Sequence, residues 1–264
     1  MSEKLLSVEN LTMKFGGLIA IDDLSFSAKK DQITSIIGPN GAGKTTVFNC
    51  LTGFYKATSG SMFLNKDNKT LDLKKFSDFK IAQKAGVART FQNIRLFPQM
   101  SVLENMMVAQ HNKLMMASGF SILGLINAPS FLKKEKEAKE ISKYWLDIIN
   151  LTNRADDNAG DLPYGDQRKL EIVRAMCIEP HLLCLDEPAA GLNAKESAEL
   201  NKLLKFIQKE KKTGILLIEH DMSVVMGISD HVVVLNYGKK IFEGTAQETK
   251  TSPEVIEAYL GTEE

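Results

Sequence analysis

Residues 38–45 read GPNGAGKT and combine three glycines with a lysine and a threonine. Glycines in such a loop let successive backbone N–H groups turn inward around a triphosphate, where a Cβ atom would block the approach. Lys44 supplies a positive charge for the β- and γ-phosphates, and the hydroxyl of Thr45 is placed to bind Mg²⁺. The pattern predicts an ATP site whose phosphate loop consists of Gly38, Pro39, Asn40, Gly41, Ala42, Gly43, Lys44, Thr45 and Thr46.

Two adjacent acids, Asp186 and Glu187, follow a run of four apolar residues. An aspartate at the end of a strand beside a phosphate loop can hold Mg²⁺ through water. The glutamate next to it is placed to orient and deprotonate the attacking water. An acidic pair at a strand end is common by itself, but here it comes after a phosphate loop and directly before Pro188.

His220 follows the next apolar run, residues 215–218. Parallel strands bring their carboxyl ends to one edge of a sheet, so we expect His220 to lie near the γ-phosphate. Taken alone, this histidine would be assigned to the surface. The remaining histidines keep that surface assignment: His111, His181 and His231.

The elements that position these residues form an α/β core. Residues 33–37, which read ITSII, are rich in β-branched isoleucine and predict a short strand. A helix through residue 51 follows and directs its positive dipole end at the phosphates. Residues 182–185 and 215–218 show no polar alternation, which is typical of strands buried on both faces. Strands that alternate with helices, such as 195–212, imply a mostly parallel sheet. Residues 232–243 form a closing hairpin.

Two further regions surround that core. Alternating apolar residues at 6–14, 21–28 and 59–64 predict an antiparallel side sheet. A short strand at 86–90 precedes a mostly helical stretch from 92 to about 161, with helices at 103–110 and 133–150. The second helix has a charged front and a core stripe at helical spacing that consists of Ile141, Trp145, Ile148 and Ile149.

Residues 114–132 carry no charge and are about as long as a bilayer span. Glycine, serine, asparagine and proline interrupt this segment. We therefore expect a loop or a short helical hairpin that packs on the protein or touches a membrane partner, in preference to a membrane span.

Composition narrows the function classes. Lysine plus arginine (33) equals aspartate plus glutamate (33), and no basic stripe is visible, so we expect no nucleic-acid partner. The start of the chain has no apolar signal core, which favours a cytoplasmic location. The three cysteines, Cys50, Cys177 and Cys184, sit among apolar residues without CxxC spacing, and we expect buried thiols.

Taken in order, these motifs resemble the ATP-binding cassette (ABC) ATPases along almost the whole chain. The matching residues are Phe15, the phosphate loop, Gln92 in TFQ, the LPYGD run at 162–166, Asp186-Glu187-Pro188, Gly191-Leu192-Asn193 and His220. The resemblance implies an ABC-type P-loop NTPase fold, with a RecA-like, mostly parallel sheet, an antiparallel side sheet and an inserted helical subdomain. It implies one ABC domain over 1–264, with a nucleotide-binding core at about 1–91 and 162–264 and a helical subdomain at about 92–161.

The same resemblance implies roles for individual residues. Phe15 would stack on adenine, Gln92 would sense Mg²⁺ and the attacking water, and Glu187 would be the catalytic base. His220 would contact the γ-phosphate. The metal would be held by Thr45, Gln92 and Asp186.

The signature run Leu162-Pro163-Tyr164-Gly165-Asp166 departs from the family's usual LSGGQ. Pro163 removes a serine hydroxyl, which leaves the N–H groups of Tyr164 and Gly165 and the start of a helix at 167–177 to meet phosphate. Asp166 places a negative charge there, which is unfavourable unless it points away or caps the helix. Asn193 replaces the usual aspartate, so communication between the two ATP sites can differ in detail.

These departures, together with EPAAGLN, IEHDM and the ending PEVIEAYLG, resemble the LivG-type ATPase subunits of branched-chain amino acid importers. That resemblance implies a permease, a second ABC subunit that is identical or related, and indirectly a periplasmic or extracellular solute-binding protein. It implies a peripheral location on the cytoplasmic face of the inner (plasma) membrane. The ATPases of urea or amide importers and of lipopolysaccharide-type exporters remain alternatives. We expect permease contact on the helical insertion and on the 92–100 loop, whose apolar anchors are Ile94, Leu96, Phe97 and Met100. The alternative is that these four residues are buried in an ordinary core.

Overall fold

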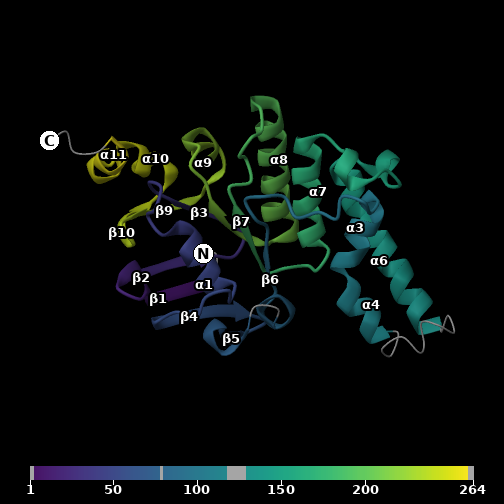
Figure 1. Ribbon diagram of the computed structural model, residues 1–264, viewed down its shortest axis with the longest axis horizontal. Helices are drawn as coiled ribbons and strands as arrows, with labels where there is room; N and C mark the ends of the chain where they lie inside the picture. Colours follow the sequence, from purple (N-terminus) through teal and green to yellow (C-terminus); the bar gives the residue numbers. More distant parts are fainter. Residues whose placement is uncertain (1–2, 78–79, 118–128, 261–264) are drawn as a thin grey trace. The chain divides into compact units, whose positions relative to one another are not determined.

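A computed structural model describes residues 3–77, 80–117 and 129–260. Internal contacts divide the chain into two units, residues 1–92 with 180–264, and residues 93–179. Residues 162–179 belong to the second unit by these contacts, whereas the sequence placed them with the nucleotide-binding core. The elements of both units are labelled in Figure 1.

A six-stranded sheet forms the centre of the first unit, in the order β10-β9-β3-β8-β7-β6. Its five strands from β9 to β6 are parallel, and β10 closes the sheet as an antiparallel hairpin with β9. Every residue of β3, β7 and β8 is buried, as the unbroken apolar runs predicted for β7 and β8. The strands are β3 (Ile33–Ile37), β6 (Val87–Arg89), β7 (Leu182–Asp186), β8 (Gly214–Ile218), β9 (His231–Asn236) and β10 (Lys239–Gly244).

The register of this sheet explains where the chemistry gathers. Ile218 of β8 lies opposite Asp186 of β7 on one side and Ile36 of β3 on the other. The residues that follow each strand, Gly38, Glu187 and Glu219, therefore leave the sheet at the same edge.

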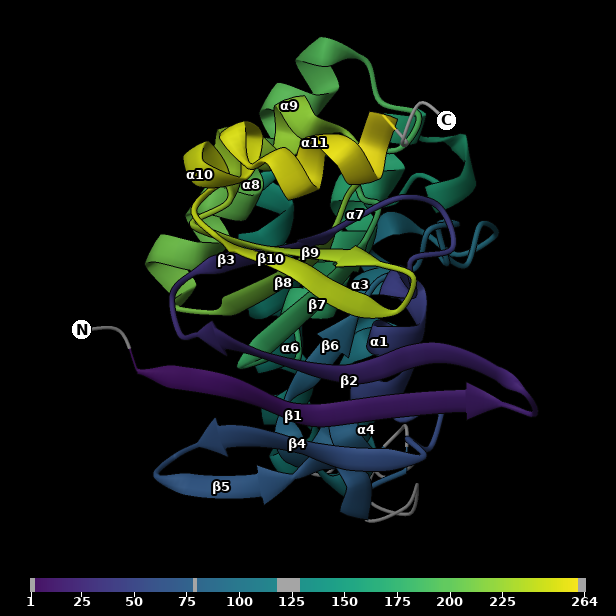
Figure 2. The ribbon, with the colours of Figure 1, turned by 90° about the vertical axis from the view of Figure 1, so that its left-hand side faces the viewer.

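The expected side sheet is also present, in the order β2-β1-β4-β5 with antiparallel pairing. Its buried side chains share one core with α1 (Lys44–Leu51) and with the larger sheet. Figure 2 shows the ribbons of this side sheet below the larger sheet. The strands are β1 (Lys4–Phe15), β2 (Leu18–Lys29), β4 (Ser59–Lys66) and β5 (Lys69–Asp72). The antiparallel side sheet and the mostly parallel core sheet confirm the predicted fold class.

Helices cover the other side of the core sheet, with α9, α10 and α11 above it in Figure 2. The longest, α8 (Ala194–Lys211), buries Leu200, Leu203, Leu204 and Ile207, as its periodicity predicted. The remaining helical segments of this unit are η1 (Leu73–Lys75), the π-helical turn η2 (Ile81–Ala85), α9 (Met222–Ile228), α10 (Ala246–Thr251) and α11 (Pro253–Leu260).

The second unit is helical. In its longest helix, α6 (Pro129–Ile148), Trp145 is buried, and so is Ile149, which directly follows the helix. Ile141 and Ile148 are half-buried. The fully buried Asn105 fixes the preceding loop, because its amide donates to the Phe97, Met100 and Ser101 carbonyls and accepts from the Phe97 N–H. The helices are α3 (Val102–Ala109), α4 (His111–Ala117), α6 (Pro129–Ile148), η3 (Thr152–Arg154), η4 (Ala159–Asp161) and α7 (Tyr164–Met176).

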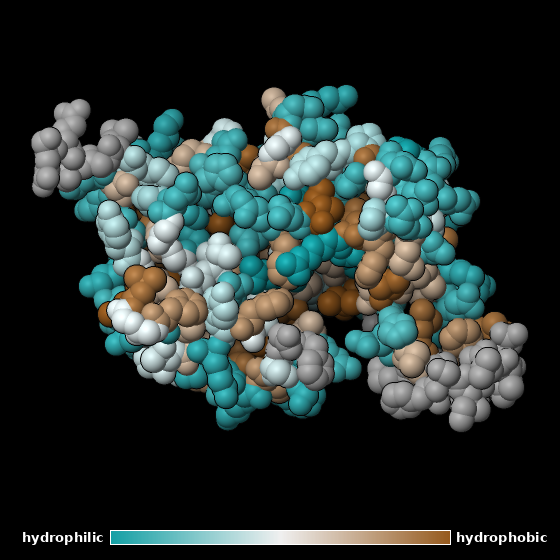
Figure 3. Space-filling model, in the orientation of Figure 1, coloured by the Kyte–Doolittle hydropathy of each residue, from teal (hydrophilic) through white to brown (hydrophobic). Residues whose placement is uncertain are grey.

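Only the ends of the uncharged segment 114–132 fall on described residues, in α4 and α6, and residues 118–128 lie outside them. Among the described residues, no helix combines the length and the apolar character that a bilayer crossing needs. The three cysteines are buried and reduced, as expected. Figure 3 shows hydrophilic residues over much of the visible face, with apolar residues scattered between them.

Candidate functional site

The phosphate loop is tightly enclosed by neighbouring backbone. Gly38, Gly41 and Gly43 have φ angles of 147°, 80° and 99°, which side-chain-bearing residues rarely adopt. A Cβ atom on Gly38 would lie 2.0 Å from the Leu235 carbonyl oxygen, and one on Gly43 would lie 2.6 Å from that of Ala20. Gly43 is the residue before α1, so the loop feeds directly into the start of that helix. Close neighbouring backbone thus requires glycine at 38 and 43, whereas at Gly41 only the positive φ favours it.

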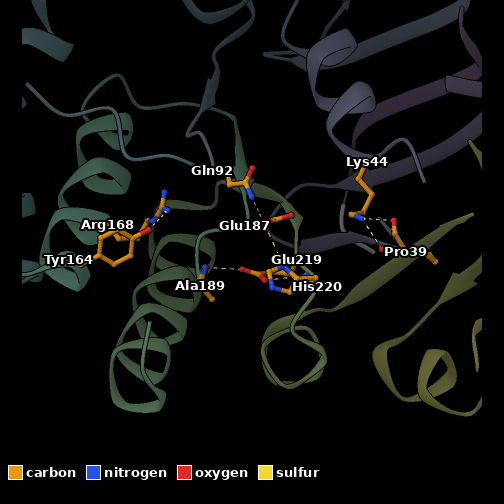
Figure 4. Close-up of polar contacts among 10 residues, drawn as sticks. Pro39, Lys44, Gln92, Tyr164, Arg168, Glu187, Ala189, Glu219 and His220 are labelled. Atoms are coloured by element: carbon orange, nitrogen blue, oxygen red, sulfur yellow. Dashed lines mark hydrogen bonds and ion pairs between the residues drawn. The ribbon is translucent and has the colours of Figure 1, made fainter. Parts of the chain in front are cut away.

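Lys44 is the first residue of α1 and is 7% exposed. Its Nζ donates to the carbonyl oxygens of Gly38 at 2.7 Å and Pro39 at 2.9 Å, as Figure 4 shows. Burial lowers the pKa of this ammonium group, and the charges of Glu187 and Asp186 raise it. The cation is therefore held within the loop, where it can neutralise a bound anion.

Glu187 lies immediately after β7, and its carboxylate is close to two other predicted site residues, Gln92 and His220. Gln92 donates from Nε2 to the Glu187 Oε2 atom at 2.8 Å, and His220 Nδ1 lies 3.6 Å from the same oxygen. Glu187 has a φ of 48°, which is a left-handed conformation for a residue with a side chain. Strained backbone of this kind concentrates at functional sites. The arrangement in Figure 4 places an oriented carboxylate at the edge of the sheet.

Asp186 forms a buried ion pair that the sequence analysis did not anticipate. Arg89, at the end of β6, donates from one guanidinium nitrogen to Asp186 Oδ2 at 2.9 Å. Its other terminal nitrogen donates to Asn49 Oδ1 at 2.6 Å and to Thr52 Oγ1 at 3.2 Å. The rings around the guanidinium are those of Phe48, Phe54 and Phe91. The sequence signal that could have indicated this ion pair is the position of Arg89, a charged residue at the end of an otherwise apolar strand.

The predicted metal ligands are oxygen donors of the type that Mg²⁺ takes: the Thr45 hydroxyl, the Gln92 amide oxygen and the Asp186 carboxylate. Within the described ranges, no group of three or more histidine, cysteine, aspartate or glutamate side chains could form a protein-only metal cage. Mg²⁺ commonly keeps water and substrate phosphates as ligands and takes few from the protein. The donor set therefore fits a metal that arrives with a nucleotide.

Phe15 is the last residue of β1 and is 41% exposed. Its ring meets the edge of Tyr55, with a centroid distance of 5.1 Å and an interplanar angle of 78°. This contact fixes one side of Phe15 and leaves an accessible aromatic surface suited to a nucleobase.

The signature run lies in the second unit and differs from its predicted form. Helix α7 begins at Tyr164, not at Gln167, with Pro163 as the residue before it. Proline pre-sets a φ that is compatible with entry into a helix and lacks an N–H to satisfy. Asp166 therefore lies in the first turn, where its carboxylate pairs with Lys169 Nζ at 2.8 Å and does not cap the helix.

A buried pair supports that first turn. Arg168 is fully buried and donates to Glu171 Oε2 at 3.0 Å and to the Tyr164 hydroxyl at 3.1 Å. Glu171 Oε1 accepts from the Arg95 backbone N–H at 2.9 Å. Burial raises the pKa of Glu171, while the Arg95 N–H and the charges of Arg168 and Arg174 lower it. The sequence analysis missed this network, because charged residues on a helix usually form its solvent-exposed face.

Asn193 has a structural role in the first unit. Its side-chain oxygen accepts from the Lys195 and Glu196 N–H groups at 3.0 Å each, and the Glu196 carboxylate accepts from the Asn193 N–H at 2.9 Å. This capping box starts α8.

Comparison with known proteins adds independent evidence. A family model described as "ABC transporter" matches residues 21–190, and one described as "Branched-chain amino acid ATP-binding cassette transporter" matches residues 239–264. The chain is 49% identical to the high-affinity branched-chain amino acid transport ATP-binding protein BraF of Pseudomonas aeruginosa, over 99% of both chains. It is equally similar, at 49% over 99% of both, to LivG of Escherichia coli K12, which carries the same description.

Solved structures agree. A nucleotide-free ATP-binding cassette from an ABC transporter superposes with a TM-score of 0.81 at 31% identity, and covers 98% of this chain and 99% of its own. The ADP conformation of another such cassette superposes with a TM-score of 0.80 at 28% identity, over 98% of this chain and 100% of its own.

Proposed function

Because the chain belongs to the ATP-binding cassette transporter family, we propose that it binds ATP with Mg²⁺, hydrolyses ATP and drives a membrane permease for branched-chain amino acids. The observation that carries this proposal is the convergence of Lys44, Gln92, Glu187 and His220 on one edge of the parallel sheet. Each side chain suits a different part of an ATP hydrolysis reaction.

ATP binding follows from the loop and from Phe15. The triphosphate accepts from the inward N–H groups of the loop, and Lys44 exchanges the Gly38 and Pro39 carbonyls for β- and γ-phosphate oxygens. Phe15 stacks on adenine. Thr45, Gln92 and Asp186 would hold Mg²⁺, which would neutralise phosphate charge when bound. Arg89 fixes the Asp186 carboxylate for that task.

Hydrolysis is assigned to Glu187 as general base for the attacking water. Gln92 restrains the carboxylate by donating to Oε2, so the base is oriented before the substrate arrives. His220, whose side chain is 56% exposed, contacts the γ-phosphate and stabilises the charge that develops there.

A second cassette completes each ATP site in this proposal. The N–H groups of Tyr164 and Gly165 lie at the start of α7, where they and the helix dipole suit a phosphate of the partner's ATP. Asp166 does not oppose this role strongly, because Lys169 pairs with it. The partner is an identical or a related ABC ATPase, and the pair works at the cytoplasmic face of the membrane.

Permease contact is proposed for the loop at 94–100, whose shape Asn105 fixes from within. Phe97 is 48% exposed and offers an apolar anchor. Recovery of the full chain, but not of the Phe97→Asp variant, with the assembled permease supports this surface. Equal recovery of both contradicts it.

Branched-chain amino acids are the proposed solutes because of the relatives' descriptions and the C-terminal match at 239–264. A solute-binding protein outside the membrane would deliver them to the permease. Uptake of labelled leucine by the reconstituted transporter supports this assignment, whereas uptake of urea or amides alone, or lipopolysaccharide export, supports one of the alternatives.

The catalytic assignment is tested with Glu187→Gln in the assembled transporter. We expect ATP turnover to fall at least about a hundredfold, while the Kd for ATP stays within about threefold. Glu210→Gln, an exposed glutamate in α8, is the matched control and should retain full turnover. Unchanged turnover in Glu187→Gln contradicts the assignment.

A further inference from the structure

Two glutamates follow neighbouring strands of the core sheet and have different surroundings. Glu187 follows β7, and its side chain is 19% exposed, whereas Glu219 follows β8 and is fully buried. Asp186 and Ile218, the last residues of these strands, lie opposite each other in the sheet. The mechanism above uses Glu187 and leaves Glu219 without a role.

Glu219 is satisfied by backbone donors of the active-site segments. Its Oε1 atom accepts from the Ala189 N–H at 2.8 Å, and its Oε2 atom accepts from the His220 N–H at 3.3 Å. Burial raises the pKa of this carboxyl group, and the N–H groups of Ala189, His220 and Asp221 together with the charge of His220 lower it. Burying a carboxylate is costly unless such donors compensate it. The bonds join the segment after Glu187 to the residue that carries the catalytic imidazole (Figure 4).

The backbone at Glu187 needs such support. Its φ of 48° is unfavourable for a residue with a side chain, and conformations of this kind persist only where the surroundings fix them. The Glu187 N–H donates to the Ile218 carbonyl at 2.9 Å, which holds the turn on one side. The bond from the Ala189 N–H to Glu219 holds it on the other side.

We propose that Glu219 is a positioning residue for ATP hydrolysis, which holds Glu187 in its left-handed turn and fixes the backbone of His220 relative to it. This inference rests on the proposed function, because it concerns the placement of the groups assigned there to the reaction. Glu219 touches no substrate in this account and acts through two backbone N–H groups.

The test is Glu219→Gln in the assembled transporter. Glutamine keeps the shape of the side chain but replaces one accepting oxygen with an NH₂ group, which faces a backbone donor and cannot accept from it. We expect kcat to fall at least about tenfold while the KM for ATP stays within about threefold, since the phosphate loop is unaltered. A merely structural loss would lower the amount of active protein and would not produce this split in enzyme corrected for its folded fraction.

The matched control is Glu248→Gln. Glu248 also accepts a backbone N–H, from Thr245 at 2.7 Å, but it caps α10 and has no role at the site. It should retain wild-type kcat and KM. A Glu219→Gln kcat within twofold of the wild type overturns the inference, whereas a wild-type transporter without ATP hydrolysis overturns the proposed function instead.

If Glu219→Gln does not fold, amide hydrogen exchange in the wild-type chain decides. The inference predicts that the Ala189 N–H exchanges at least about a hundredfold more slowly than in an unstructured peptide. Exchange of that amide at the rate of an unstructured peptide overturns it.

Discussion

The phosphate-loop edge of the first unit and the signature turn of the second unit are built in different ways. At the sheet edge, three glycines with positive φ, a left-handed Glu187 and the aligned ends of β3, β7 and β8 place the working groups. Side-chain bonds from Gln92 and Arg89 then hold the two acids. At the start of α7, a buried side-chain network holds Tyr164 through Arg168 and Glu171. The first design leaves no room for a side chain at Gly38 or Gly43, whereas the second supports a turn whose residues depart from the family pattern.

The largest expected effect is a loss of stability when the side-chain network at the start of α7 is disrupted. Arg168→Met leaves the buried Glu171 carboxylate without its cation, which should lower the free energy of unfolding of this unit by about 3–5 kcal/mol. Urea unfolding followed by fluorescence measures this directly, because the chain has one tryptophan, Trp145, buried in the second unit.

The matched double variant, Arg168→Met with Glu171→Gln, removes the charge but keeps an acceptor for the Arg95 N–H. It should recover most of the lost stability. A double variant as unstable as the single one would show that the ion pair is not what supports the signature turn.

The next effect breaks the first design without touching stability. Gln92→Ala removes the hydrogen bond to Glu187, so kcat for ATP hydrolysis should fall about ten- to a hundredfold in the assembled transporter. Binding of ATP measured without Mg²⁺ should change little, since Lys44 and the loop are intact and Gln92 is assigned only to Glu187 and the metal. Gln247→Ala, on an exposed site of α10, is the control. An unchanged kcat in Gln92→Ala would mean that Glu187 needs no orienting partner.

A smaller effect on stability is expected at Asn193, where the chain departs from the aspartate that is usual in the family. Asn193→Ala removes the helix cap of α8 and should lower the free energy of unfolding by about 1 kcal/mol. Asn193→Asp restores the family's usual residue and should be neutral, because aspartate caps equally well. Loss of stability in Asn193→Asp, measured by urea unfolding, would show that the amide has a further partner.

The smallest expected effect is a pH-dependent change of stability at Glu243, which lies outside both regions. The hydrogen bond from His231, together with Lys240, lowers the pKa of Glu243 from 4.5 to about 2 in spite of its partial burial. Because the folded-state pKa is depressed, the stabilisation is fully present above pH 4.5 and is lost as the pH falls toward 2. The melting temperature of Glu243→Gln should therefore lie slightly below that of the wild type at pH 7 and should converge with it near pH 2. A constant difference across this range would contradict the assignment.

The contrast also explains what the sequence could predict. The sequence predicted that the glycine loop, the acids at the end of β7 and the histidine after β8 meet at one edge of the sheet, because each lies at or just after the carboxyl end of a core strand. Their chemical roles remain predictions. Arg89, Arg168, Glu171 and Glu219 were missed, because their roles depend on partners that are distant in sequence or hidden on a helix face. Nothing in the residue types alone separates a fully buried glutamate at 219 from a partly exposed one at 187.

The start of α7 illustrates a second limit. The sequence placed the helix start at Gln167, whereas α7 begins three residues earlier, at Tyr164. Proline is well suited to the entry of a helix, and packing of Arg168 extends the first turn over the glycine. Tertiary packing therefore decides such boundaries, and local propensity does not.

The central claim is that the 38–45 loop grips a triphosphate through its backbone and Lys44. Calorimetric titration of the full-length chain with ATP and Mg²⁺ tests this most directly, with Lys44→Ala beside the wild type and Lys202→Ala, an exposed lysine of α8, as the control. We predict saturable binding by the wild type and the control, and binding at least about thirtyfold weaker in Lys44→Ala. Equal affinity in all three chains, or no binding by the wild type, would contradict the account.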